Sequence, residues 1–179
     1  MNCAWRSKRL DSVYGQQRNA LNSQGTSHYQ GRNAANAELD AFLAPLYPAE
    51  SQHGYSIEKL IEQKVEFFVL YHGGSPAGCA GIQFFSDPRE PSGTYGELKR
   101  MYVRDEFRGQ GLGRILLDHV EQVAAAKGVV KLRLETGTLQ DAAIGLYEDS
   151  GFHKIPPFGE YEEDPLSLFY EKNLANRSS

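Results

Sequence analysis

The chain has 179 residues, of which 40% are hydrophobic, and this size and composition suit a single domain with an ordinary core. Its formal net charge of −4 is uneven, because residues 1–37 are basic and the remainder is acidic. An acidic body argues against nucleic acid as the main partner and suits a cationic substrate.

The apolar runs and the cysteines narrow the possible classes of protein further. No apolar run approaches the length that a membrane span needs. The two cysteines, Cys3 and Cys79, form no disulfide or metal-binding pattern, which favours a reducing compartment. We therefore expect a cytoplasmic protein without a metal.

The start of the chain gives little structural signal. Residues 1–32 are basic, rich in serine, asparagine and glutamine, and without sustained periodicity, so we expect an irregular leader. A short strand within 23–31 is an alternative. So is a targeting peptide, although an apolar secretory segment is missing. The domain itself is expected over 33–174, followed by a tail at 175–179.

Two helices open the predicted domain. Apolar residues along one side of 33–43 predict the first helix, and Pro45 and Pro48 end it. Ser56 can cap a second helix over 57–63.

Three strands are expected next. The run 65–71 is β-branched and aromatic, and a hairpin turn at 72–75 joins it to a second strand over 76–85. A loop then leads to a third strand over 94–104. Strict alternation along this third strand places one set of side chains on a single face: Glu97, Lys99, Met101 and Val103.

A glycine-rich turn lies between the third strand and a helix-like run. It consists of Arg108, Gly109, Gln110, Gly111, Leu112 and Gly113. Glycine lets backbone amides press against a ligand, and the first amides of a helix lack intrahelical acceptors at the positive end of its dipole. This combination suits phosphate or pyrophosphate.

The kind of phosphate site is not decided by the turn alone. A Walker loop would need Gly-Lys-Ser/Thr at its end, and a dinucleotide fingerprint would need glycine where Arg114 stands. Three spaced glycines are also compatible with a plain helix boundary.

Helices and strands alternate through the rest of the chain. The helix that begins at Leu112 has apolar residues at helical spacing until Gly128, and 130–135 reads as a strand with one apolar face. A short helix is expected over 138–149, and Gly151 ends it.

Two terminal strands, 155–161 and 166–172, flank the acidic loop 162–165. This order of elements predicts a mixed α/β chain with a predominantly antiparallel sheet.

The turn fits the pattern Arg-x-x-Gly-x-Gly, and the segment 146–152 downstream reads Leu-Tyr-Glu-Asp-Ser-Gly-Phe. Together these motifs resemble the GCN5-related N-acetyltransferase (GNAT) family, from about residue 36 to 174. The resemblance implies a mixed, mostly antiparallel sheet of about six or seven strands, a splayed parallel pair and about four helices. The tail 156–161, with 167–169, resembles a branch of mostly uncharacterised bacterial acetyltransferases, and we expect selectivity to depend on it.

The resemblance implies acetyl-coenzyme A as the cosubstrate. Its pyrophosphate is expected on the amides of the glycine-rich turn, and its pantetheine arm is expected to pair with the backbone of a bulged strand beside a splayed neighbour. The expected cofactor-binding residues are Met101, Tyr102, Val103, Arg108, Gly109, Gln110, Gly111, Leu112, Gly113, Arg114 and Gln140.

Transfer to an amine needs a base. A lysine-like amine has a pKa of about 10.4, so freeing its lone pair at pH 7 costs about 4–5 kcal/mol, and a carboxylate can receive the proton. Glu97 stands where histone-acetylating relatives carry their glutamate base. Glu135 is the reserve; ordered water with a backbone carbonyl, or a purely structural ion pair at either glutamate, are the alternatives.

Collapse of the adduct also needs an acid. Tyr147 occupies the usual tyrosine position of the family and is expected to protonate the departing sulfur or donate a hydrogen bond to it. A helix tyrosine that merely covers the core is the alternative.

The sequence therefore predicts an acetyl-coenzyme A-dependent N-acetyltransferase that acetylates a primary amine of a small molecule or peptide. Direct transfer in a ternary complex is favoured, because no cysteine lies near the motifs. The resemblance places Tyr47, Glu50 and His53 near the acceptor. A homodimer is left open, and neither nucleic acid nor a membrane is an expected partner. The alternatives are a non-catalytic acyl-coenzyme A-binding module and an unrelated nucleotide-binding protein.

Overall fold

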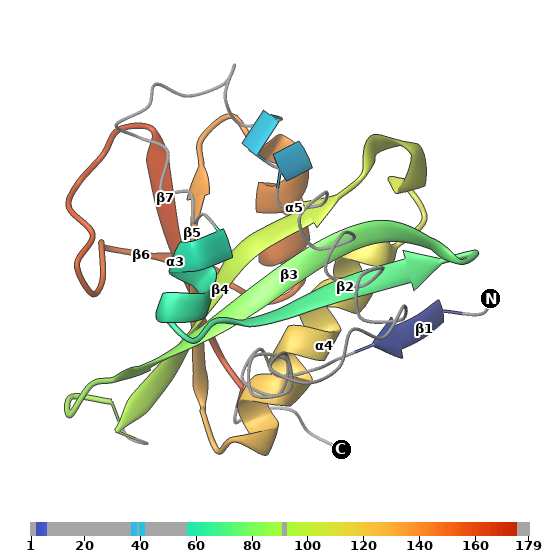
Figure 1. Cartoon of the computed structure of the whole chain (residues 1–179). Helices are drawn as coiled ribbons and strands as arrows, with labels where there is room; N and C mark the ends of the chain where they lie inside the picture. Colours follow the sequence, from blue (N-terminus) through green and yellow to red (C-terminus); the bar gives the residue numbers. More distant parts are fainter. Residues whose placement is uncertain (1–2, 7–36, 39, 42–56, 91–92, 175–179) are drawn as a thin grey trace.

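A single seven-stranded sheet organises the molecule (Figure 1). The computed structural model describes residues 3–6, 37–38, 40–41, 57–90 and 93–174. The strand order is β1-β2-β3-β4-β5-β7-β6, and every neighbouring pair is antiparallel except β4 and β5. The strands are β1 (Cys3–Arg6), β2 (Glu66–His72), β3 (Ser75–Ser86), β4 (Thr94–Val103), β5 (Lys131–Gly137), β6 (His153–Ile155) and β7 (Ser167–Asn173). The predicted mixed, mostly antiparallel sheet with one parallel pair is confirmed.

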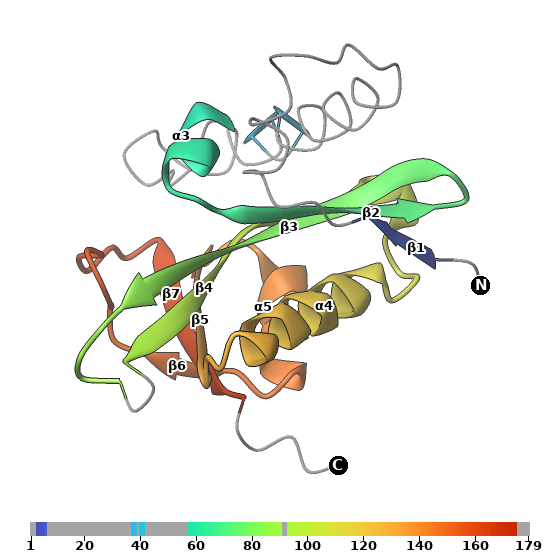
Figure 2. The same ribbon diagram turned by 60° about the horizontal axis from the view of Figure 1, so that its bottom comes forward.

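Helices cover both faces of the sheet. Figure 2 shows α3 on one face and α4 and α5 together on the other. Their bounds are α3 (Ile57–Glu62), α4 (Leu112–Ala126) and α5 (Asp141–Asp149), with a 3-10 turn, η2 (Asp105–Phe107), before α4. Residues 37, 38, 40 and 41 are also helical, inside the helix predicted over 33–43. Within the described part of the chain, no helix has the length and apolarity needed to cross a membrane.

Several sequence expectations fall outside the described residues. They are the strand within 23–31, the helix-ending Pro45 and Pro48, the capping Ser56, and the acceptor-facing Tyr47, Glu50 and His53.

Local turn chemistry agrees with the sequence. The two-residue connection between β2 and β3 has φ values of +59° at Gly73 and +85° at Gly74, which glycine accommodates and which match the twist of a tight hairpin. At the end of α4, the Val129 amide donates to the Ala124 carbonyl at 3.1 Å around Gly128, whose φ is +74°. This is the αL helix ending that the glycine predicts.

The main core lies between the sheet and helices α4 and α5. Leu116, Leu117 and Val120 of α4 have no exposed surface and pack against the inward side chains of β3, β4 and β5. Burying each such side chain contributes about 1.5–3 kcal/mol. A second cluster on the opposite face joins Leu60 of α3 to Phe67 of β2 and its neighbours.

β4 contains a bulge near its end. Gly81 of β3 pairs with Lys99, and Cys79 pairs with Tyr102, so two residues of β4 lie opposite one residue of β3. Arg100 has a φ of +55°, in the left-handed region that a non-glycine residue rarely adopts. Such strain costs about 1–3 kcal/mol and is typical of functional sites.

The bulge overturns one sequence expectation, that Glu97 and Met101 share a face. Met101 packs in the core cluster on the α4 face, together with Leu98. Glu97 pairs with Lys99 on the opposite face. The extra residue at Arg100 reverses the alternation, so side chains before and after it exchange faces.

The parallel pair splays apart, as expected. β4 and β5 share only the register pairs Gly96–Leu132 and Glu97–Arg133, whereas β5 pairs with β7 along its whole length. From Leu98 onward, no described strand pairs with the β5-side edge of β4. Main-chain groups on that edge therefore have room to pair with an extended ligand.

Two strands differ from those predicted from the sequence. β1 lies in the segment expected to be irregular, and it pairs antiparallel with β2 at the sheet edge. β6 spans His153–Ile155, so the strand predicted over 155–161 shares only Ile155 with it. Pro156 and Pro157 follow immediately, and proline has no amide hydrogen to donate to a neighbouring strand.

Candidate active site

The glycine-rich turn presents the uncapped start of α4. Gly109 and Gly111 have φ values of +73° and +74°, and Gly111 is the N-cap residue of the helix. No side chain caps this end, and its first turn contains no acidic residue. The first amides of the helix and the positive end of its dipole therefore remain suited to an anionic ligand.

Two arginines fix the turn to the rest of the fold. The Arg108 Nε donates to the Val103 carbonyl at 3.0 Å, which ties the turn to the end of β4. The Arg114 Nη1 donates to Ser150 Oγ at 3.0 Å, which ties α4 to the end of α5. Both guanidinium groups are roughly half exposed, so each can also contact a ligand phosphate.

The remaining residues of the predicted cofactor set have varied environments. Gln110 is exposed on the turn, and Leu112 is buried in the core. Gln140 is the N-cap residue of α5, where its carbonyl accepts from the amide of Ile144 at 2.9 Å. Its side chain makes no capping hydrogen bond, so the expected pantetheine contact stays a prediction.

Three elements meet behind the bulge on the α4 face. Tyr147 of α5 is 6% exposed, and its hydroxyl lies 3.8 Å from Met101 Sδ of β4. At Gly113 of α4, an added Cβ would lie 3.1 Å from Leu146 Cδ2 and 3.8 Å from Met101 Cε. The fold thus brings together the tyrosine, the post-bulge strand and the first turn of α4, as the motifs predict.

The environment of Tyr147 keeps its hydroxyl protonated. Burial raises the pKa of Tyr147 well above its ordinary value of 10, and the negative charge of Glu135 raises it further. Met101 offers this hydroxyl a thioether, which is a weak acceptor. A protonated donor beside a weak acceptor is chemically suited to a departing thiolate.

Glu97 lies on the opposite face of β4, in a buried polar triad with Lys99 and Tyr161. Glu97 is 2% exposed, and its Oε1 accepts a hydrogen bond of 2.7 Å from the Tyr161 hydroxyl. Lys99, two residues along the strand, forms an ion pair with the same oxygen and lies 3.0 Å from the Tyr161 oxygen. We call Glu97, Lys99 and Tyr161 the β4 triad.

The sequence predicted only part of this triad. Alternation places Lys99 on the same face as Glu97, so the ion pair was within reach of sequence reasoning. Tyr161 is 64 residues away in the chain, and only the fold brings it to Glu97. The reserve base, Glu135, accepts a hydrogen bond from Ser167 Oγ at 2.7 Å.

Cys79 is poorly placed to carry an acyl group. It has no exposed surface, and burial raises the pKa of its thiol to about 12. Its Sγ donates to the Arg100 carbonyl at 3.4 Å. The reactive thiolate is therefore scarce at neutral pH.

Comparisons with known proteins agree with this geometry. The model of the acetyltransferase (GNAT) family matches residues 33–152. The chain is 44% identical to IAA acetyltransferase of Azospirillum brasilense, over 76% of this chain and 86% of that protein. It is 33% identical to the uncharacterized N-acetyltransferase YsnE of Bacillus subtilis, over 71% of this chain and 82% of that one.

A solved structure gives the same fold. PaiA N-acetyltransferase from Thermoplasma acidophilum, in complex with coenzyme A, has a TM-score of 0.63 and 17% identity, covering 97% of this chain and 99% of that chain. From the family match and the relatives, we conclude that the chain belongs to the acetyltransferase (GNAT) family and is an acyltransferase.

Proposed function

We propose that this enzyme transfers the acetyl group of acetyl-coenzyme A directly to a primary amine of a small molecule or peptide. The observation that carries the proposal is the gap between β4 and β5. A protonated tyrosine, Tyr147, lies on one face of β4 beside this gap, and a carboxylate, Glu97, lies on the other. An acid and a base on opposite sides suit a reaction in which an amine attacks and a thiolate leaves.

In the proposed complex, the diphosphate contacts the amides of 109–114 at the start of α4. The pantetheine arm extends along the open edge of β4 and pairs with the main chain of Met101, Tyr102 and Val103. The uncapped helix start and the edge of β4 that β5 leaves open from Leu98 onward support this path. Amides near the bulge would polarise the thioester carbonyl.

The proposed chemistry has three steps. The amine attacks the thioester carbon, and its proton passes to Glu97, with Glu135 or ordered water as the alternative acceptors. The tetrahedral adduct then collapses, the carbon–sulfur bond breaks, and Tyr147 donates its proton to the sulfur. A buried, weakly acidic Cys79 favours direct transfer over a covalent acyl-enzyme.

The proposed class of acceptor is inferred from the charge of this chain. The body of the chain is acidic, which favours a cationic amine over nucleic acid, and we include a cytoplasmic location in the proposal. IAA is included among the test acceptors because a relative named IAA acetyltransferase is 44% identical.

The test is release of free thiol from acetyl-coenzyme A with a panel of amino acids, polyamines, peptides and IAA. We expect at least one amine to raise the release rate about tenfold or more over the blank, which corresponds to about 1.4 kcal/mol. Coenzyme A should displace bound acetyl-coenzyme A, whereas ATP should not. Tight cofactor binding without release for any amine would contradict the proposed acceptor class.

A further inference from the structure

The function proposed above uses only the main chain of Met101, yet the side chain of this residue contacts the proposed acid. Tyr147 donates its hydroxyl hydrogen to Met101 Sδ at 3.8 Å, and no other described residue accepts a hydrogen bond from this hydroxyl. Tyr147 is 6% exposed and belongs to the main core, against which Met101 packs. Within the described structure, the direction of the Tyr147 hydroxyl hydrogen therefore depends on Met101.

The bulge of β4 brings Met101 to Tyr147. Under strict alternation, Met101 would share the face of Glu97, on the side of β4 away from Tyr147. The extra residue Arg100, with its φ of +55°, turns Met101 to the α4 face instead. β-bulges beside active sites often re-aim a side chain in this way. The strained residue thus places a thioether against the tyrosine.

Packing holds both partners of this hydrogen bond. An added Cβ at Gly113 would lie 3.8 Å from Met101 Cε, so the first turn of α4 passes beside the methyl group of Met101. The ring of Tyr147 lies 5.9 Å from the Phe152 ring and 6.5 Å from the Tyr170 ring. Close-packed interiors resist displacement of such side chains, so the sulfur and the hydroxyl keep their relative positions.

Building on the function proposed above, we infer that Met101 is a positioning residue for the acid step. Its thioether aims the Tyr147 hydroxyl at the part of β4 that β5 leaves open, and gives the hydroxyl up to the coenzyme sulfur. The O–H bond of a phenol lies in the plane of the ring and can point to either side. The thioether selects the side that faces β4, and Met101 itself exchanges no proton.

A weak acceptor is the right kind of group for this task. A thioether accepts hydrogen bonds poorly, whereas a thiolate is charged and accepts them strongly, so the departing sulfur can take the hydrogen bond from Met101. The neighbouring Tyr170 provides the contrast, because its hydroxyl donates to the Glu148 carboxylate at 2.8 Å. A carboxylate at the place of Met101 would compete with the thiolate, and a purely apolar side chain would leave the Tyr147 hydroxyl without direction.

Replacement of methionine by norleucine tests the role of the sulfur. The chain has two methionines, Met1 and Met101, so residue-specific incorporation alters a single internal side chain. Norleucine keeps the length of the side chain and removes the acceptor. With the best amine of the panel, kcat for thiol release should therefore fall about fivefold, as expected for the loss of one neutral hydrogen bond. The acetyl-coenzyme A Kd, measured by calorimetry, should stay within about twofold, because the proposed cofactor contacts of Met101 are main-chain.

Selenomethionine at the same two positions is the matched control. Selenium keeps a weak acceptor where norleucine has none, so kcat should stay within about 1.5-fold of the wild type. A selenomethionine protein that loses as much kcat as the norleucine protein would contradict the positioning role.

The Tyr147→Phe background separates aiming from packing. Without a hydroxyl, the thioether has nothing to aim, so Met101→Leu should lower kcat about fivefold in the wild type and less than about 1.5-fold in Tyr147→Phe. The same loss in both backgrounds, or an unchanged kcat in the norleucine protein, would overturn the role of Met101 while the proposed function stands. No thiol release by the wild type with any amine would overturn both together.

Discussion

At Tyr147, a single hydroxyl carries the proposed acid step. Tyr147→Phe should lower kcat by about 10²-fold and leave the acetyl-coenzyme A Kd within about twofold, because the proton is needed only when the sulfur departs. Since burial raises the pKa of Tyr147 above 10, its proton is present throughout the range below pH 10. Deprotonation of Tyr147 should therefore not lower the kcat of the wild type anywhere below pH 10. Steady-state thiol release over a pH series measures both effects.

Tyr170→Phe provides the matched control for Tyr147. Tyr170 is fully buried, its ring lies 6.5 Å from the Tyr147 ring, and its hydroxyl donates to Glu148 at 2.8 Å. Removing this hydroxyl should reduce stability by about 1–2 kcal/mol and leave kcat within about threefold. Equal kcat in the wild type and in Tyr147→Phe would remove Tyr147 from the mechanism.

Glu171 makes stability depend on pH. Burial alone would raise its pKa, but hydrogen bonds and charge from Arg133 and Lys131 outweigh burial and lower it below its ordinary value of 4.5. A depressed folded-state pKa stabilises the fold above the unfolded-state pKa, and this contribution is lost as pH falls. The free energy of unfolding should therefore decline from about pH 4.5 downward, and less steeply in Glu171→Gln.

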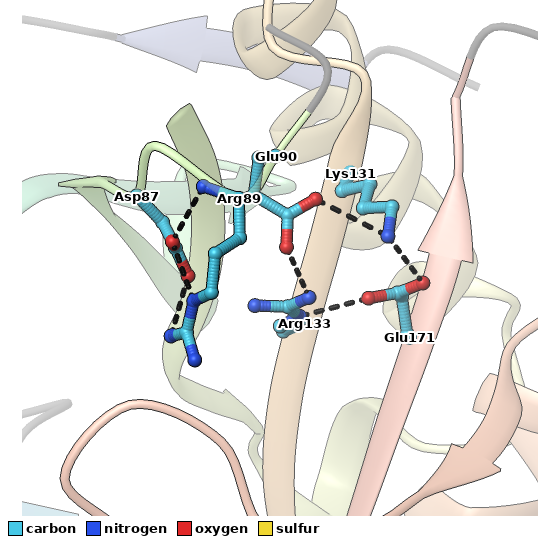
Figure 3. Close-up of polar contacts among 6 residues, drawn as sticks. All are labelled: Asp87, Arg89, Glu90, Lys131, Arg133 and Glu171. Atoms are coloured by element: carbon cyan, nitrogen blue, oxygen red, sulfur yellow. Dashed lines mark hydrogen bonds and ion pairs between the residues drawn. The ribbon is translucent and has the colours of Figure 1, made fainter. Parts of the chain in front are cut away.

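Urea unfolding of the wild type and Glu171→Gln at several pH values measures this contribution. The difference in unfolding free energy should be constant from pH 6 to 7 and shrink below about pH 4.5. A difference that stays constant down to pH 3 would mean that the ion pairs of Figure 3 do not control this carboxylate.

Individual residues differ in how far the sequence could predict them. Tyr147 is part of a recognisable motif, and the structure places its hydroxyl 3.8 Å from Met101 Sδ, beside the strand expected to pair with the pantetheine. The Tyr161–Glu97 hydrogen bond spans 64 residues and follows from no local pattern. The prediction that Glu97 and Met101 share a face of β4 was wrong, because a bulge at Arg100 reverses the alternation of side chains. No alternation rule reveals such a bulge.

At the scale of elements, the start of α4 is the proposed diphosphate site. Gly111→Glu should weaken coenzyme A binding by about 10²-fold or more, because it puts a carboxylate at the amides that the phosphates need. Its φ of +74° also strains any side chain, at about 1–2 kcal/mol. Calorimetry with coenzyme A, alongside thermal unfolding, separates the two effects.

Gly128→Glu controls for the strain. Gly128 has the same φ of +74°, open space around an added Cβ, and a place at the far end of α4. It should lower the melting temperature about as much as Gly111→Glu and leave coenzyme A binding intact. Equal binding by both variants would place the diphosphate away from this helix start.

The elements themselves were largely predictable. Turn glycines, apolar spacing and β-branched runs gave α3, α4, β2, β3, β4 and β5 close to their observed bounds, because each depends on local chemistry. β1 was missed, since Cys3–Arg6 carries no alternation long enough to read and gains its strand from pairing with β2. β6 was placed too late in the chain, because the predicted strand over 155–161 shares only Ile155 with the observed His153–Ile155 and the prolines after Ile155 prevent further ladder bonds.

At the scale of the whole molecule, the fold places the proposed acid and the proposed base on opposite faces of one sheet. Helices α4 and α5 bring the uncapped amides and Tyr147 to one face, while the β6–β7 loop brings Tyr161 to Glu97 on the other. The open edge of β4 beside β5 connects the faces. Family membership was predictable from the glycine turn and its partner motif. The strand order β5-β7-β6 was not predicted, because no local signal shows that the last strand of the chain lies between β5 and β6.

A crystal structure with bound coenzyme A is the most direct test of this arrangement. Diphosphate oxygens should lie within hydrogen-bonding distance of amides from 109–114, the pantetheine should run along β4 beside the gap to β5, and the sulfur should lie within reach of the Tyr147 hydroxyl. Coenzyme A bound elsewhere, or a sulfur far from Tyr147, would contradict the account.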